Sequence, residues 1–201
     1  MALNFANNNS LSAITTKPSG LSGGSMNLIS TQTASSSSTI SFTSGIDSTY
    51  DEYVFKFYDI HPATNDTKLQ FQVDTGTNTN YNQTITSTSF ETYHNENDAD
   101  QGLGYRAAGD QAQGSGFQEL NGGMGNENDN SVVGTLTIFN PSSSVFVKHF
   151  MATTNHIYNS AYTDNSFTAG YVNTTTALTR VQFKMSSGNI DSGVIKLYGI
   201  S

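Results

Sequence analysis

The sequence predicts an all-β protein built as an antiparallel β-sandwich. From Met26 onward, short runs of β-branched and aromatic residues alternate apolar with polar side chains, which is typical of strands with one buried face. No window of about twelve residues combines helical periodicity with capping residues. The 201 residues include 12 Phe and 10 Tyr, which supply the apolar surface that one sizeable core requires.

The first 25 residues differ in composition from the rest of the chain. They carry few core-sized side chains and end in Gly23-Gly24-Ser25, which is typical of an arm or linker. Such a segment needs a partner surface to become ordered. We therefore divide the chain into an N-terminal arm, residues 1–25, and a single β-sandwich domain, residues 26–201.

The alternating pattern predicts strands at 26–33, 39–43, 52–60, 67–74, 82–92, 132–140, 144–154, 167–173, 177–186 and 193–200. In the fourth run, Leu69, Phe71 and Val73 alternate with polar residues, so one face is buried and the other is wet. The run 53–58 is apolar on both faces, which indicates a strand at the centre of the sandwich or one covered by a neighbouring subunit.

The connections between strands differ in length. Residues 140–143, Asn-Pro-Ser-Ser, form a turn signal that predicts a hairpin between the strands on either side. Residues 93–131 and 155–166 are long and polar, and we expect loops there. Because a structureless loop of the first length is uncommon, it should be functional or contain a short strand, near 102–107 or 117–120. Loops on a rigid sandwich commonly carry binding function.

Charge and composition argue against several partners. The formal net charge of −8 repels phosphate and anionic lipid, and no Lys/Arg cluster offsets it, so we expect no nucleic-acid partner and no membrane insertion. The absence of cysteine leaves no disulfide and no thiolate metal site. The first residues lack the basic and apolar regions of a signal peptide, and no apolar run reaches membrane-spanning length.

Two motifs suggest chemistry but have simpler interpretations. Asp74-Thr75-Gly76 after a strand matches the local signature of an aspartic protease, with 132–134 as its apolar partner segment, but no second Asp-Thr-Gly supplies the other aspartate. A turn closed by the aspartate explains it better. The acids Glu91, Glu96, Asp98, Asp100, Glu127 and Asp129 offer oxygen ligands for Ca²⁺, but their spacing is not that of an EF-hand, and a solvated acidic loop is favoured.

The four histidines form no metal-binding motif. His61, His94, His149 and His156 are far apart in sequence, and each is better explained as a hydrogen-bonded sheet or loop residue. Convergence of histidines on a trimer axis is the alternative. We therefore predict no catalytic residue, no metal and no cofactor.

Aromatic residues of the two polar stretches are the candidate ligand contacts. Rings stack on sugar faces while neighbouring amides and carboxylates bind hydroxyls, which makes a glycan-binding surface of Tyr93, Tyr105, Phe117, Tyr158 and Tyr162. The alternative is that these side chains plug the ends of the sandwich or pack at a subunit interface. The absence of Trp favours this alternative.

Several stretches together resemble a known group of proteins. Four stretches, distributed from one end of the chain to the other and ending in Gly-Ile-Ser, are similar to small virion structural proteins of marine tailed bacteriophages, including cyanophages and pelagiphages; they are residues 3–20, 50–78, 138–150 and 173–201. The resemblance implies a jelly-roll-like sandwich, assembly into homotrimers and exposure on a virion assembled in the host cytoplasm. The strand pattern agrees with that fold.

The sequence thus favours a structural role on a phage particle and not an enzyme. The first hypothesis is a capsid decoration protein or short head fibre, in which arm residues dock on the major capsid protein or on a tail or fibre protein, the anchors being Leu3, Phe5, Leu11, Ile14 and Leu21. The alternative is a receptor- or glycan-binding tail-fibre module that uses the polar loops on a host-surface glycan. A glycan hydrolase is least favoured, because spacing does not justify a carboxylate pair such as Glu91 and Asp98.

Overall fold

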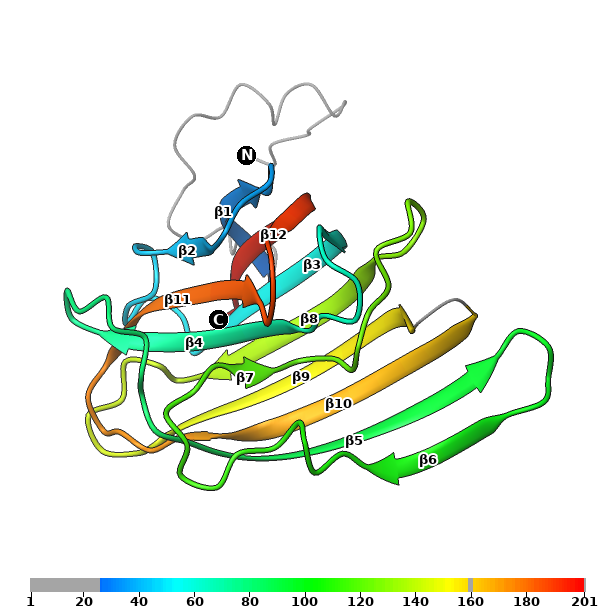
Figure 1. The fold of residues 1–201 in the computed structure, drawn as a ribbon. Helices are drawn as coiled ribbons and strands as arrows, with labels where there is room; N and C mark the ends of the chain where they lie inside the picture. Colours follow the sequence, from blue (N-terminus) through cyan, green and yellow to red (C-terminus); the bar gives the residue numbers. More distant parts are fainter. Residues whose placement is uncertain (1–25, 159–160, 201) are drawn as a thin grey trace, which may run out of the picture.

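The computed structural model describes residues 26–158 and 161–200. These residues contain twelve β-strands, all paired antiparallel, and no helix (Figure 1). The predicted all-β class is confirmed. Within the described ranges, no helix is available that could cross a membrane.

The strands form two sheets. The wider sheet contains, in spatial order, β1 (Met26–Thr33), β12 (Ile190–Ile200), β3 (Glu52–Pro62), β8 (Val132–Phe139), β9 (Lys148–Tyr158), β10 (Tyr162–Val172), β5 (Ile85–Asn95) and β6 (Gln101–Tyr105). The narrower sheet contains β2 (Ile40–Phe42), β11 (Leu178–Met185), β4 (Leu69–Thr75) and β7 (Gln118–Glu119).

Eight of these strands have the nested pairing of a jelly roll. β1 pairs with β12, β2 with β11, β3 with β8, and β4 with β7, so that early strands pair with late strands in reverse order. Successive strands of this set alternate between the two sheets in the first half of the chain. This arrangement is a double Greek key. The predicted jelly-roll-like sandwich is therefore confirmed.

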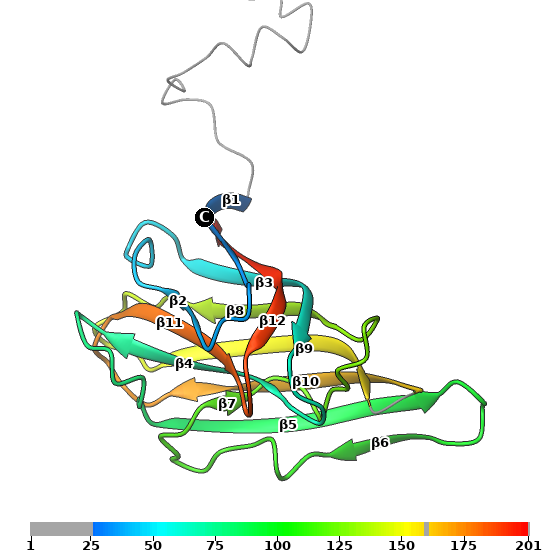
Figure 2. The same ribbon diagram turned by 45° about the horizontal axis from the view of Figure 1, so that its top comes forward.

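Two inserted hairpins widen one sheet of the jelly roll. β5 and β6 lie between β4 and β7 in sequence, and β9 and β10 lie between β8 and β11. Both hairpins extend the wider sheet beyond β8, in the order β9-β10-β5-β6. In Figure 2, β5 and β6 continue beyond the strands of the narrower sheet. The inner face of this extension is consequently only partly covered by strands.

The core between the two sheets is rich in phenylalanine. Phe183 of β11 contacts Phe42, Phe55 and Phe57 edge to face, with ring centroids 5.2–6.2 Å apart. All four side chains are at most 2% exposed. We call these four residues the phenylalanine cluster. One contiguous hydrophobic core includes residues of both sheets, and β3, the strand predicted to be central, lies between β12 and β8.

The predicted hairpin at residues 140–143 is present, but its second strand starts later than predicted. Asn140 adopts a φ of 42°, and its carbonyl accepts a hydrogen bond from the Ser143 amide at 3.1 Å. Residues 144–147 are not a strand. Instead, the ammonium group of the buried Lys148 donates hydrogen bonds to the carbonyls of Ser143, Phe146 and Thr174. These bonds hold the loop close to the lysine ammonium group.

The prediction of a long polar loop at 155–166 is wrong. Residues 155–158 end β9 and residues 162–166 begin β10, with Tyr158 paired to Tyr162. Their inward side chains are largely polar, so the apolar face that signals a strand is missing. The stretch 93–131 begins with the end of β5 and contains β6 and β7, so both positions proposed for a short strand there, 102–107 and 117–120, hold one. The arm, residues 1–25, lies outside the described residues.

Candidate functional site

The inner face of the inserted hairpins changes from apolar to polar along its strands. Side chains two residues apart share a face of a strand. The register therefore aligns facing residues of β9, β10 and β5, in that order, in three rows: Tyr158–Tyr162–Asn95, His156–Asp164–Tyr93 and Thr154–Ser166–Glu91. A strand face that would ordinarily be apolar here presents rings, hydroxyls, an imidazole and carboxylates.

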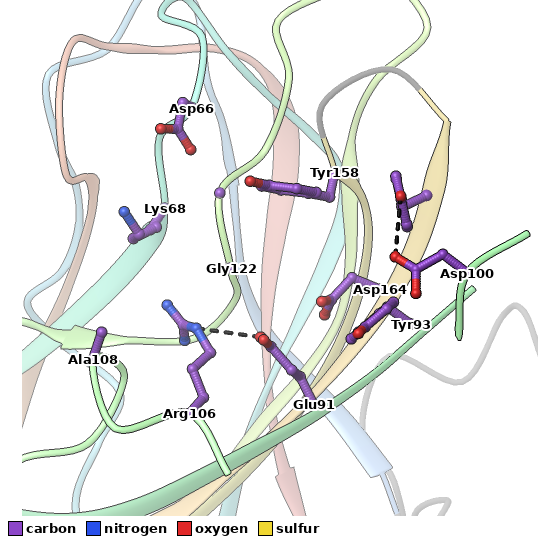
Figure 3. Close-up of a pocket in the computed structure, with 12 residues that line it drawn as sticks. Asp66, Lys68, Glu91, Tyr93, Asp100, Arg106, Ala108, Gly122, Tyr158 and Asp164 are labelled. Carbon is purple, nitrogen blue, oxygen red and sulfur yellow. Dashed lines mark hydrogen bonds and ion pairs between the residues drawn. The ribbon is translucent and has the colours of Figure 1, made fainter. Parts of the chain in front are cut away.

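Five residues of these rows line one side of a cavity of about 460 Å³ (Figure 3), namely Tyr158, Tyr162, Tyr93, Asp164 and Glu91. The other side is formed by Asp66 and Lys68, just before β4, and by Gly122 and Gly123 between β7 and β8. The volume lies within the ~300–1,000 Å³ range of small-molecule sites. We call this space the cleft.

Three tyrosines line the cleft near the β9–β10 turn. The rings of Tyr158 and Tyr162 are 6.2 Å apart at 70°, and those of Tyr93 and Tyr162 are 6.1 Å apart at 62°. The Tyr162 hydroxyl donates to the Asp100 carboxylate at 3.2 Å. We call the three residues the tyrosine cluster. They are three of the five aromatics predicted as ligand contacts, and they come from strands and not from loops.

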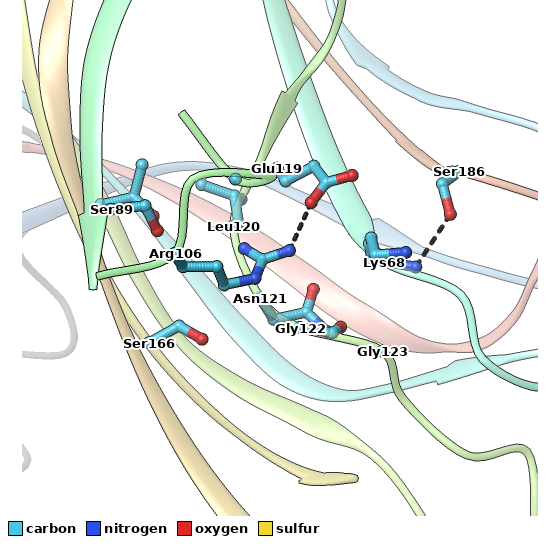
Figure 4. A network of polar contacts seen from close by, with 12 residues as sticks. Lys68, Ser89, Arg106, Glu119, Leu120, Asn121, Gly122, Gly123, Ser166 and Ser186 are labelled. Carbon is cyan, nitrogen blue, oxygen red and sulfur yellow. Dashed lines mark hydrogen bonds and ion pairs between the residues drawn. The ribbon is translucent and has the colours of Figure 1, made fainter. Parts of the chain in front are cut away.

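A buried arginine organises the floor of the cleft (Figure 4). The Nε atom of Arg106 lies 3.3 Å from a Glu91 carboxylate oxygen, and Nη2 bonds the carboxylate of Glu119. The arginine side chain is only 8% exposed, and Nη1 has no partner among the described residues. A Cβ on Gly109 would lie 2.3 Å from Nη1, so a glycine is required for this placement.

His156 and Asp164 face each other behind this ion pair. Burial lowers the pKa of His156 to about 4. The hydrogen bond to the Gly123 carbonyl raises this pKa, and the positive charge of Arg106 lowers it further. Burial also raises the pKa of Asp164 to about 6, although Ser166 donates a hydrogen bond to it. At neutral pH the imidazole is therefore uncharged.

The protonation of the neutral imidazole follows from its partners. Its Nε2 lies 3.2 Å from the Gly123 carbonyl, which can only accept, so Nε2 carries the proton. Nδ1 then presents a lone pair toward Asp164, 3.7 Å away, which is too long for a hydrogen bond. The buried Nδ1 has no other partner in the described ranges. His156 and Asp164 thus form a buried polar contact and not an ion pair.

Gly122 and Gly123 keep the opposite wall of the cleft open. A Cβ on Gly123 would lie 2.1 Å from an Asp66 oxygen and 3.0 Å from a ring carbon of Tyr158. The wall is fixed at both ends, because Met124 and Thr67 exchange backbone hydrogen bonds and the Thr154 hydroxyl donates to the Leu120 carbonyl. The backbone itself therefore forms this surface.

The other two predicted ligand aromatics lie outside the cleft. Tyr105 of β6 is 60% exposed, and its hydroxyl bonds Asp110. Phe117 lies under the ammonium group of Lys184, 4.4 Å from the ring centroid. The proposed arm anchors Leu3, Phe5, Leu11, Ile14 and Leu21 lie outside the described residues.

The Asp74-Thr75-Gly76 motif is a structural turn. Asp74 is fully buried and accepts hydrogen bonds from the amides of Thr75 and Tyr81 and from the Gln83 side chain. Gly76 has a φ of +57°, as the turn interpretation requires. Residues 132–134 belong to β8 in the other sheet, so they are not a partner segment for this turn.

The acidic residues considered as Ca²⁺ ligands and the four histidines do not come together as a metal site among the described residues. The described part of the chain contains no group of three His, Asp or Glu side chains arranged to hold a metal ion. Asp98 contacts His94 at 3.1 Å, and Glu127 bonds the Asn130 side chain. His61 Nδ1 lies 2.7 Å from the Asn130 carbonyl, and His149 packs beside Tyr171.

Comparison with known proteins yields no relative: no protein-family model, no curated protein and no solved structure matches the chain. The fold and the geometry of the cleft are therefore the features that bear on function. Sequence reasoning did not single out Arg106, Asp164, Lys68 or the Gly122-Gly123 wall. The period-two spacing of 154, 156 and 158, repeated at 162, 164 and 166, is the signal that could have identified the polar inner face.

Proposed function

We propose that the protein is a glycan-binding module and that the cleft is its binding site. The observation that carries this proposal is the tyrosine cluster, set beside carboxylates, an ammonium group and exposed backbone in one cavity. Rings cover the apolar faces of sugars, and the polar groups pair with hydroxyls. The cleft offers both kinds of contact within a few residues.

The buried charges support a binding role over a purely structural one. Arg106, Glu91, Glu119 and Asp164 are costly to desolvate, and well-packed apolar residues in their place would commonly be neutral or stabilising. A part that only covers a lattice gains nothing from them. A site that must orient a polar ligand benefits from such charges, because a network of paired charges holds in place the groups that contact the ligand.

The resemblance to phage virion proteins supplies the setting of this proposal. The module would be displayed on the particle as a homotrimer, with the arm attached to the capsid or to a tail or fibre protein and the cleft directed toward a host-surface glycan. Arm docking through Leu3, Phe5, Leu11, Ile14 and Leu21 depends on the sequence alone. Docking and glycan recognition use different parts of the chain and are compatible.

One observation favours a second candidate, glycoside hydrolysis. Asp164 has a raised pKa while Glu91, diagonal to it on the neighbouring strand, pairs with Arg106. A protonated acid beside an ionised carboxylate is the arrangement that glycosidases use. Release of reducing ends from a bound polysaccharide, abolished in Asp164→Asn, would favour this candidate over binding alone.

A glycan array with purified full-length protein tests the binding site. The wild type should bind a defined subset of glycans, and Tyr158→Ala should weaken that binding about tenfold, as expected for loss of ~1–1.5 kcal/mol of ring stacking. The matched control is Tyr58→Ala, because Tyr58 is 40% exposed and Tyr158 is 41% exposed, but Tyr58 lies on β3 away from the cleft. An array without binding, or equal losses in both variants, would refute the site.

A further inference from the structure

The cleft has an acidic lining. Among the described residues that line it, the carboxylates Asp66, Glu91, Asp100 and Asp164 outnumber the cations Lys68 and Arg106. Arg106 already forms ion pairs with Glu91 and with Glu119, and Glu119 is not itself part of the cleft lining. Lys68 is thus the lining cation without such carboxylate pairing in the described ranges, and the cleft as a whole repels anions.

The tyrosine cluster adds a second feature that favours positive charge. The ring of Tyr162 contacts those of Tyr158 and Tyr93 at steep interplanar angles, and all three tyrosines line the cleft. The faces of aromatic rings attract cations. The hydrogen bond from Tyr162 to Asp100 places a carboxylate at the edge of the cluster.

A carboxylate also borders the other end of the cluster. One oxygen of Asp66 and one ring carbon of Tyr158 both lie within 3.0 Å of the point that a Gly123 side chain would occupy. The Asp66 carboxylate and the Tyr158 ring therefore both pack against the Gly123 backbone, in space that any other residue would fill with its side chain. This packing places a carboxylate beside the ring of Tyr158, at the lining of the cleft.

Elsewhere in the described residues, lysine ammonium groups lie over aromatic rings. Lys184 lies over Phe117, Lys196 over Tyr58 and Lys56 over Tyr198, at 4.4, 5.2 and 5.8 Å from the ring centroids. In the described part of the chain, no lysine or arginine lies over a ring of the tyrosine cluster. The rings that lie beside carboxylates are therefore the ones over which none of the described residues places a cation.

We infer that the ligand of the cleft carries a positively charged ammonium group, which the tyrosine cluster would hold between Asp66 and Asp100. Two sources present this chemistry on a cell surface: an amino sugar with a free amine, or a quaternary ammonium headgroup such as choline. The first source depends on the proposed glycan-binding function, and the second does not. Anionic glycans are excluded by the carboxylates.

Isothermal titration calorimetry with the purified full chain tests the inference. One pair of ligands is a β-1,4-linked glucosamine oligomer and its N-acetylated form, and the other is choline and its uncharged isostere 3,3-dimethylbutanol. We expect the charged member of at least one pair to bind tenfold or more tightly than its neutral partner. Asp66→Asn and Asp100→Asn should each reduce this preference about threefold, whereas Asp51→Asn, at an exposed acid that precedes β3 and does not line the cleft, should not.

The outcomes separate the two proposals. Equal binding of both oligomers, lost in Tyr158→Ala, would overturn the ammonium inference and uphold the glycan site. Binding of choline but of neither oligomer would uphold the ammonium inference, assign it to a headgroup and count against the glycan proposal. An absence of binding by all four ligands would overturn the inference.

Discussion

The interior of the sandwich has two parts with opposite chemistry. Around the phenylalanine cluster, rings from both sheets interlock with at most 2% exposure, and no charge is involved. On other strands of the wider sheet, β5, β9 and β10, the inner face instead carries Glu91, His156 and Asp164, close to Arg106. One sheet thus contributes to a dry core and to a charged cleft.

The difference separates the residues that stabilise the fold from those that shape the site. Close-packed rings contribute burial and dispersion, and their removal leaves a cavity. Buried charges contribute little net stability, but each becomes costly once its partner is removed. We therefore expect large stability losses from the apolar part, conditional losses from the charged part, and ligand effects from the cleft alone.

Phe183→Ala should give the largest loss of stability. Its ring contacts three others, so truncation removes apolar burial and opens a cavity, at a cost of about 3–5 kcal/mol in the free energy of unfolding. Urea denaturation followed by circular dichroism measures it. Phe90→Ala is the control, because Phe90 stacks on Phe167 but is 41% exposed, and it should cost about 1 kcal/mol. Equal losses would contradict the separation of the two parts.

Arg106→Met should cost less, and the loss should be reversible by further substitution. Removing the guanidinium leaves Glu91 and Glu119 partly buried without a cation, at about 2 kcal/mol after allowance for their exposures of 28% and 19%. Adding Glu91→Gln and Glu119→Gln removes the stranded charges and should recover most of the stability. If the triple variant is as unstable as the single one, the arginine acts through packing and not through charge.

The charged part should also control the pH dependence of stability. Asp164 has a pKa of about 6 in the native state against 3.8 unfolded, so its contribution falls as pH rises from 3.8 to 6. His156 has a pKa of about 4 in the native state against 6.5 unfolded, so its contribution to stability falls as the pH drops from 6.5 to 4. The two slopes oppose each other, and between pH 4 and 6 they nearly cancel in the wild type.

Single substitutions should expose the two slopes separately. In Asp164→Asn the histidine slope remains, and stability should rise with pH between 4 and 6.5, whereas in His156→Gln it should fall between about 4 and 6. Each slope should approach 1.4 kcal/mol per pH unit, about one proton, relative to the wild type. Urea titrations at several pH values measure this, with Asp51→Asn as the control. Parallel curves for all four proteins would refute the assignment.

The same contrast explains what could be predicted from the sequence. Where the inner face is apolar, as at Leu69, Phe71 and Val73, alternation identified the strand and its buried side. Where the inner face carries His156, Asp164 and Ser166, the alternation is between polar residues, so the sequence predicts a loop at 155–166 although it predicts strands on either side. Hydrophobic patterning detects a strand only while burial is apolar.

The site was predictable in kind but not in composition. Tyr93, Tyr158 and Tyr162 were identified as ring contacts from their polar neighbours, although two are on a hairpin predicted as loop. Arg106 could not be recognised, because its partners Glu91 and Glu119 become neighbours only through pairing of β5 with β6 and of β4 with β7. Long-range register is not encoded in local pattern.

Gly122→Ala should have the smallest effect on stability and a selective effect on the cleft. The new methyl would lie 3.4–3.6 Å from His156 and Glu91, which is ordinary contact, so the free energy of unfolding should change by less than about 0.5 kcal/mol. The methyl nevertheless occupies cleft volume at the floor, and ligand affinity should fall at least tenfold. Gly116→Ala, which adds a methyl to open space outside the cleft, should change neither quantity. Unchanged ligand affinity in Gly122→Ala would mean that ligands bind nearer to the tyrosine cluster than to the floor of the cleft. A large loss of stability would mean that the Gly122-Gly123 wall supports the fold in addition to lining the cleft.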